Sequence, residues 1–224
     1  MSDLSVIYED NHILVVNKTA GLLVQSDQTG DESLVDIAKL YIKNKYQKPG
    51  DVFLGLVHRL DRPTSGVIVL ARTSKALTRL NKQFKDRVPK KIYRAIVSGT
   101  PKSSARLKHY LKKNSSKNKS FHYNEITPNA KHAILHYRHV ESLKSYHVLE
   151  IELETGRHHQ IRAQLAAVGL HIKGDLKYGS KRTNPNGSIH LHARFLQFVH
   201  PTKKAEMKFV ASYPNDPIWN ALTD

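Results

Sequence analysis

Short apolar runs and segments of helical periodicity alternate along the first hundred residues. Apolar residues after Ser33 recur at positions 34, 37, 38 and 41, so the sequence predicts an amphipathic helix over 34–46 that Ser33 caps. A second periodic segment predicts a helix that begins after Ser74. Runs of β-branched and apolar residues predict strands at 6–8, 13–17, 22–25, 67–71 and 91–99, with 67–71 buried on both faces.

The second half of the chain is richer in predicted strands. Residues 100–130 are polar, basic and aperiodic, which indicates a basic loop or hairpin. Further strands are predicted at 133–140, 145–154, 189–198 and 207–211, with a helix after Thr155 and Gly156 and a short helix near Trp219. There is no internal repeat and no linker between two compositions. The pattern predicts one α+β domain over 1–224.

The composition of the chain indicates a class of binding partner. The chain has 36 Lys and Arg against 19 Asp and Glu, a net charge of +17, which favours a polyanionic partner over an ordinary neutral metabolic substrate. It has no cysteine, which excludes disulfides, thiolate nucleophiles and cysteine-ligated metals. The start MSDLSVIYED has no secretory pattern, and the longest apolar run, Gly66–Ala71, is far too short to span a membrane. We therefore expect a cytoplasmic protein with no membrane partner.

The segment HRLDRPTSG, His58–Gly66, has the strongest chemical character. It places Asp61 between Arg59 and Arg62 immediately before the buried strand. Two permanent positive charges favour the ionised carboxylate, and Pro63 restricts the backbone. Such a carboxylate is suited to act as nucleophile, base or electrostatic stabiliser. An Asp that bonds its own turn and pairs with Arg is the alternative that the residue types alone favour.

Other chemistries lack their residues. A glycosidase needs a second carboxylate in a comparable setting, and none is evident. The pairs His132/His136 and His190/His192 have usable spacing for a metal but no acidic third ligand nearby, and we expect no metal. No glycine-rich phosphate loop and no G-x-S-x-G elbow is present. The sequence therefore indicates no cofactor.

Six segments resemble the RluA-type pseudouridine synthases and occur in the order of that family. HRLDRPTSG is similar to the signature of that family and places Asp61 at its catalytic aspartate. The others are NKTAGLLVQ (17–25), KIYRAIVSG (91–99), TGRHHQIRAQLAAVG (155–169) and GDLKYG (174–179) followed by LHARFLQFVHP (191–201). Together they span nearly the whole chain. Thr19, Gln25 and Gln164 depart from the family's usual residues without touching the aspartate, tyrosine or arginine positions.

The resemblance implies a fold, a reaction and a site. The fold is a mixed, mostly antiparallel central sheet flanked by helices, here as the catalytic domain alone, without the small N-terminal RNA-binding domain of many relatives. The reaction isomerises uridine in rRNA or tRNA, after base flipping, through Asp61. Tyr93 would pack on the target uracil and Arg162 would pair with Asp61, while Arg59 would fill the space that the flipped base leaves.

The basic residues Arg62, Lys91 and Arg157 are further expected to contact RNA. The expected partner is therefore RNA, and the expected state is a monomer. Two rival interpretations remain open. One is a non-catalytic RNA-binding protein of the same fold, and the other is an unrelated basic hydrolase that acts on nucleosides or sugars. An isomerase leaves the mass of RNA unchanged, whereas a hydrolase releases uracil or cleaved sugar.

Overall fold

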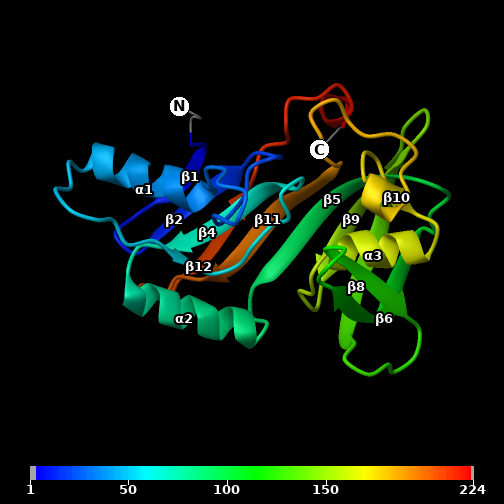
Figure 1. Cartoon of the computed structure of the whole chain (residues 1–224), viewed down its shortest axis with the longest axis horizontal. Helices are drawn as coiled ribbons and strands as arrows, with labels where there is room; N and C mark the ends of the chain where they lie inside the picture. The colour runs from blue at the N-terminus through cyan, green and yellow to red at the C-terminus, as the bar shows by residue number, and fades with distance from the viewer. Residues whose placement is uncertain (1–3, 223–224) are drawn as a thin grey trace. The chain divides into compact units, whose positions relative to one another are not determined.

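The structure is a computed structural model that describes residues 4–222. It confirms the predicted α+β class, with a mixed, mostly antiparallel sheet arrangement and three α-helices among the described residues (Figure 1). The chain divides into two compact units, which are described separately. The described parts of Met1–Lys90 and Ala193–Asp224 form unit 1, and Lys91–His192 forms unit 2. None of the helices between residues 4 and 222 is long and apolar enough to cross a membrane.

The core of unit 1 is built on a strand that is buried along its whole length. All seven residues of β4 (Ser65–Ala71) are buried, as the apolar run predicts. β4 pairs with β2 (Ile13–Lys18), whose Ile13, Leu14, Val15 and Val16 are fully buried. The strands follow the order β1 (Val6–Glu9), β2, β4 and β11 (Leu191–Val199), with β12 (Glu206–Val210) paired to β11 and the short β3 (Gly55–Leu56) paired to β4.

Two helices of unit 1 start at capping side chains. α1 (Leu34–Lys45) begins after Ser33, the cap that the sequence predicts. Ser33 and Asp36 form a reciprocal capping box. The N-cap of α2 (Ser74–Lys85) is Thr73, one residue before the predicted cap Ser74. The side chain of Thr73 accepts the N–H of Ala76. A short 3-10 helix, Trp219–Ala221, lies near the end of the described chain.

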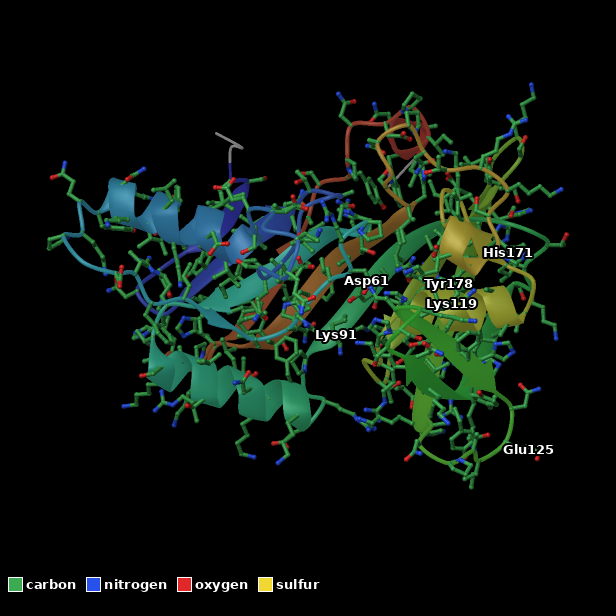
Figure 2. The ribbon with its side chains drawn as sticks, viewed as in Figure 1. Asp61, Lys91, Lys119, Glu125, His171 and Tyr178 are labelled. Carbon is green, nitrogen blue, oxygen red and sulfur yellow. The ribbon has the colours of Figure 1, made fainter. Side chains whose placement is uncertain are left out.

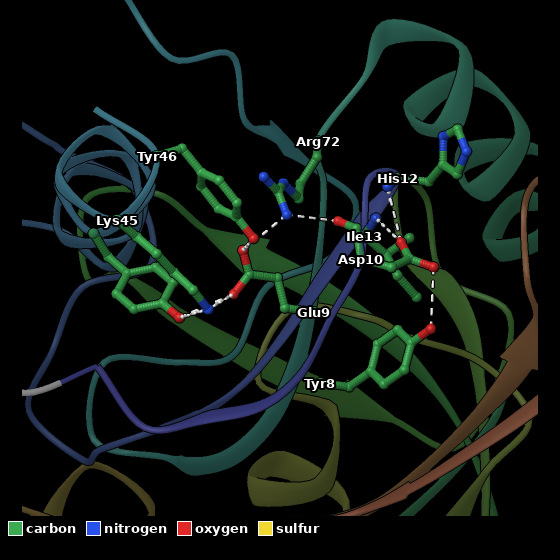
Figure 3. A network of polar contacts seen from close by, with 9 residues as sticks. Tyr8, Glu9, Asp10, His12, Ile13, Lys45, Tyr46 and Arg72 are labelled. Carbon is green, nitrogen blue, oxygen red and sulfur yellow. Dashed lines mark hydrogen bonds and ion pairs between the residues drawn. The ribbon is translucent and has the colours of Figure 1, made fainter. Parts of the chain in front are cut away.

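A polar network joins α1 to the end of β1 (Figure 3). The Glu9 carboxylate accepts hydrogen bonds from Lys45 Nζ at 2.7 Å, Tyr46 Oη at 2.7 Å and Arg72 Nη1 at 2.8 Å. Burial opposes ionisation of Glu9, but these donors hold its pKa below the usual value. Asp10 accepts the backbone N–H groups of the following turn and has its pKa lowered as well. Glu9 therefore fastens α1 to the sheet, and Asp10 fixes the turn that follows β1.

Unit 2 is a row of antiparallel strands with one helix on one face. Its strands follow the order β5 (Lys90–Ser98), β9 (His147–Leu153), β8 (Lys131–Ser142), β6 (Ser104–Asn114) and β7 (Lys119–Tyr123), and β10 (His171–Ile172) pairs with β5. α3 (Gln160–Ala167) packs against β6 and β7. Leu111 and Ala133 of the sheet are buried with Ala163 of α3 and Tyr178 of the 3-10 helix Leu176–Tyr178. The opposite face of β6 carries exposed basic residues.

Two predictions about elements are wrong, each for a local reason. Residues 22–25 form no strand beyond an isolated bridge between Leu23 and Ser33. The backbone there serves other groups, because the Leu22 carbonyl accepts from Lys18 and the Leu23 carbonyl accepts from Leu34 N–H. The aperiodic interpretation of 100–130 also misses two strands, β6 and β7, although the hairpin alternative matches. Buried Leu107, His109 and Leu111 alternate with exposed basic residues, so the period of two was hidden by a buried histidine.

Candidate active site

Asp61 lies in a tight turn between β3 and β4 of unit 1. The Thr64 N–H donates to the Asp61 carbonyl at 3.0 Å, which closes the turn before the buried strand begins. The start of the motif is also fixed, because Val69 N–H donates to His58 Nε2 at 3.1 Å. The His58 ring stacks on Phe84 of α2, with ring centroids 4.8 Å apart. The motif therefore holds a partly buried carboxylate on a rigid backbone.

Gly66 explains why the motif ends in glycine. Its φ of +121° is a conformation that L side chains rarely adopt. A Cβ at this position would lie 2.3 Å from the backbone carbonyl oxygen of Ala193 in β11. Only glycine therefore lets the turn enter β4 this close to β11.

Beneath the turn lies a buried lysine, Lys18, whose side chain is 1% exposed. Its Nζ donates to the carbonyls of Thr19 at 2.9 Å, Leu22 at 2.7 Å and Arg62 at 3.1 Å. Burial lowers the pKa of Lys18 to about 7, the Asp61 carboxylate acts in the opposite direction, and Arg62 adds to the lowering. Lys18 thus ties the residue after Asp61 to the end of β2 and contributes to the potential at the carboxylate.

Replacing Lys18 with methionine should change how stability depends on pH. The folded pKa lies near 7 and the unfolded value near 10.4, so between these values the unfolded chain holds a proton that the folded chain has lost. The free energy of unfolding of the wild type should therefore rise with pH relative to Lys18→Met, by up to about 1.4 kcal/mol per pH unit. Urea denaturation at pH 6, 7, 8 and 9 measures the difference. The exposed Lys39→Met is the matched control, and parallel profiles for wild type and Lys18→Met would contradict the prediction.

The arginines on either side of Asp61 differ in their surroundings. Arg59 is exposed. Arg62 donates through Nε to the Gly21 carbonyl at 2.9 Å and pairs through Nη2 with Asp31 at 2.8 Å, where both side chains are about half exposed. In return the Gly21 N–H donates to the Arg62 carbonyl at 2.8 Å. Arg62, predicted to contact RNA, thus also joins the Asp61 turn to the loop after β2.

In unit 2, Arg162 of α3 forms a buried ion pair with Asp175. Arg162 Nε and Nη2 donate to the two carboxylate oxygens of Asp175 at 2.7 Å and 2.8 Å, and the two side chains are 5% and 1% exposed. This bidentate geometry fixes the plane of the guanidinium. The arginine that the family resemblance assigns to Asp61 is therefore oriented by a second carboxylate, and its pairing with Asp61 stays a prediction.

The ring of Tyr178 supports the same arginine. Arg162 Cζ and Lys119 Nζ each lie 5.0 Å from its centroid. Figure 2 labels Lys119 and Tyr178 next to one another. The Tyr178 hydroxyl accepts the Ser120 N–H at 2.8 Å and hydrogen-bonds with His159 Nδ1 at 3.0 Å. Burial and the nearby charge of Arg162 lower the pKa of His159 to about 2, so this histidine is neutral at physiological pH. Neither the Tyr178 ring nor the neutral His159 carries a negative charge that would pair with Arg162 in place of Asp175.

The remaining predicted site residues also lie in unit 2. Tyr93 is a buried residue of β5, 9% exposed, and pairs with Ile151 of β9. Lys91 is partly buried at the start of the same strand. Arg157 donates through Nε to the His132 carbonyl at 2.9 Å. Among residues 4–222, no group of three or more His, Asp or Glu side chains is placed to hold a metal ion.

The roles of Lys18, Asp175 and Tyr178 were missed by the sequence analysis. All three stand inside quoted motifs, but no local pattern assigns them. The one signal for Lys18 is a lysine at the end of the apolar strand ILVVNK. For Asp175 and Tyr178 the signal is an acid and an aromatic residue in GDLKYG, between glycines that both have positive φ.

Comparisons with known proteins identify the family of this chain. The family model described as RNA pseudouridylate synthase matches residues 12–167. The chain is 34% identical over 223 residues to ribosomal large subunit pseudouridine synthase D of Zymomonas mobilis, which covers 95% of the chain and 70% of that protein. It is 33% identical over 229 residues to the protein of the same name from Vibrio cholerae, covering 96% of the chain and 69% of that protein.

A solved structure resembles the fold as well. The human RNA pseudouridylate synthase domain containing 4 superposes with a TM-score of 0.78 at 25% identity, covering 94% of this chain and 89% of that one. The segment 12–167, which the family model matches, includes the Asp61 turn, the strand that holds Tyr93 and the helix that holds Arg162. The chain therefore belongs to the RNA pseudouridylate synthase family and is an RNA pseudouridine synthase, an isomerase.

Proposed function

We propose that this chain isomerises specific uridines of structured RNA, with large-subunit ribosomal RNA as the main substrate, and that Asp61 is its catalytic residue. The observation that carries the proposal is the Asp61 turn, a partly buried carboxylate on a fixed backbone between two arginines and electrostatically coupled to Lys18. Ribosomal RNA is favoured over transfer RNA because the relatives quoted above are named as ribosomal large subunit enzymes.

The reaction needs one carboxylate and no outside reagent. The bond between ribose C1′ and N1 of uracil breaks, the base turns, and a new bond forms between C1′ and C5. The proton on C5 is then lost and N1 gains one, so atoms balance and the mass of the RNA stays the same. Asp61 is suited to attack C1′, to attack the ring, or to remove a sugar proton. Each route uses its ionised form.

A uridine in folded RNA must leave its stack to reach Asp61, at a cost of about a few kcal/mol. The exposed guanidinium of Arg59 is flat and charged, which suits it to fill the vacated space by stacking. By family resemblance, Tyr93 packs on the flipped uracil and Arg162 pairs with Asp61. The Asp175 pair supports the last assignment, because it leaves Arg162 with a fixed orientation rather than a mobile one.

The rival function is an RNA-binding protein without activity. The joint presence of Asp61, Tyr93 and Arg162 at the family's positions favours the enzyme. Incubation of the protein with RNA that carries tritium at C5 of uracil separates the two. We expect tritium to appear in solvent and pseudouridine in nuclease digests of ribosomal RNA. A failure to release tritium from any cellular RNA pool would favour the binding protein, and free uracil would favour a hydrolase.

A further inference from the structure

The outer face of the hairpin in unit 2 carries aromatic side chains that the core does not use. β6, β7 and β8 bury one face against α3, through residues such as Leu107 and Leu111. The opposite face presents an aromatic and basic surface, which we call the outer platform. It consists of Tyr110 and Lys112 of β6, Phe121 and Tyr123 of β7, and His132 of β8, with Lys108 beside them.

Strand register places these side chains next to one another. Tyr110 is directly opposite Tyr123 on one side and His132 on the other, and Lys112 is opposite Phe121. Residues directly opposite in an antiparallel pair lie on the same face, with their side chains in contact range. The rings of Tyr110 and His132 are 5.4 Å apart and tilted by 42°. The three strands therefore carry a continuous row of rings.

The two rings of this row that lie on β7 are exposed, and Tyr110 and His132 are partly buried. Phe121 and Tyr123 are each 38% exposed, whereas Ser120, which lies on the other face of β7, is 3% exposed. Exposed aromatic side chains that gather in one place indicate a binding surface rather than a part of the core.

The hairpin that carries the platform is rich in positive charge. Residues 104–131 contain seven Lys and Arg, at positions 106, 108, 112, 113, 117, 119 and 131, and a single acid, Glu125. Arg106 is paired with Glu154. Lys108 and Lys112 are exposed on the platform itself, and Lys119 Nζ lies 5.8 Å from the Phe121 ring centroid. Lysine is depleted in protein–protein interfaces, so an apolar protein partner fits this surface poorly. A polyanion with flat apolar groups fits it well.

We propose that the outer platform binds unpaired nucleotides of the RNA substrate, with bases stacked on Phe121, Tyr123 and Tyr110 and phosphates near Lys108 and Lys112. Aromatic rings in a row with interleaved lysines are the arrangement by which proteins hold single-stranded RNA without reading its sequence. The inference rests on the proposed function for its substrate class, and it adds a contact distinct from the residues assigned to the reaction.

Crosslinking locates the contact directly on the wild-type protein. A short oligouridine that contains 4-thiouridine is bound, irradiated and digested with trypsin, and the adducts are mapped by mass spectrometry. Cleavage after Lys119 and Lys131 isolates residues 120–131, which contain both Phe121 and Tyr123. We expect adducts on this peptide. Adducts that occur only on other peptides would overturn the proposal, even if the protein releases tritium from its substrate.

Binding by variants provides the second measurement. The double variant Phe121→Ala/Tyr123→Ala should bind the oligouridine about five- to a hundredfold more weakly, while Phe121→Trp/Tyr123→Phe keeps the rings and should bind like the wild type. Phe53→Ala removes a similarly exposed ring from unit 1 and is the control. Lys108→Gln/Lys112→Gln should reduce the slope of log affinity against log salt concentration by the equivalent of about two phosphate contacts. Unchanged affinity in the double alanine variant would refute the platform.

Discussion

Asp61→Asn is expected to lose pseudouridine formation by at least about a thousandfold while RNA binding stays close to that of the wild type. The substitution keeps the shape of the side chain and leaves in place the Asp61 carbonyl that closes the turn with Thr64. It removes only the charge and basicity that every route of the reaction requires. Tritium release from C5-labelled RNA measures the rate, and anisotropy of a labelled RNA measures binding.

The control for this experiment is Asp51→Asn, an exposed aspartate ten positions earlier in the same unit. It should release tritium at the wild-type rate. Activity within tenfold of the wild type for Asp61→Asn would assign the chemistry to another group. A variant that loses binding and activity together would show that Asp61 has a structural role in the turn.

Arg162→Met should lower the free energy of unfolding by about 3–5 kcal/mol. The substitution leaves the Asp175 carboxylate, which is 1% exposed, without the arginine that pairs with both of its oxygens. Breaking a buried pair on one side costs more than the pair contributes, because the charge left behind stays desolvated. Urea denaturation at neutral pH measures the loss, and the exposed Arg182→Met provides the comparison.

A double-mutant cycle tests the cause of that loss. Arg162→Met/Asp175→Leu removes both charges, so it should be clearly more stable than Arg162→Met alone. Strict additivity of the two single changes would mean that the ion pair does not account for the effect. Arg162→Lys keeps the charge but not the two-pronged geometry, and we expect it to recover only part of the stability.

The sequence predicted the elements whose signal is local. β4 is a run of seven apolar or small residues, α1 begins after its cap Ser33, and β9 alternates between apolar residues and glutamates, so burial and capping follow from the pattern itself. Asp61 stood out because of its two flanking arginines and the strand that follows. Its assignment as catalytic came from the family resemblance, since the residue types alone favoured a structural turn.

Contacts between distant segments were beyond prediction. Lys18 meets the Arg62 carbonyl 44 positions away, and the period of β2 gives no reason for a lysine to be buried. Asp175 meets Arg162 across a turn and a short strand, so helical spacing does not pair them. The segment 100–130, predicted as a basic loop or hairpin, contains β6 and β7, and its buried His109 is hydrogen-bonded with Gln164 of α3 at 3.0 Å. Such polar partners become visible only when the strands are assembled.

The order of segments along the chain sets an order for assembly during synthesis. Unit 2 is one continuous stretch, Lys91–His192, whereas unit 1 combines the beginning of the chain with its last thirty or so residues. Those late residues supply Ala193 beside Gly66, Phe209 beside Tyr8, and the Ser212 carbonyl that accepts from Asn17. During synthesis on the ribosome, all strands of the unit that carries Arg162 are made before the last strands of the unit that carries Asp61. A growing polypeptide therefore lacks a completed Asp61 support until residues 193–212 have been made.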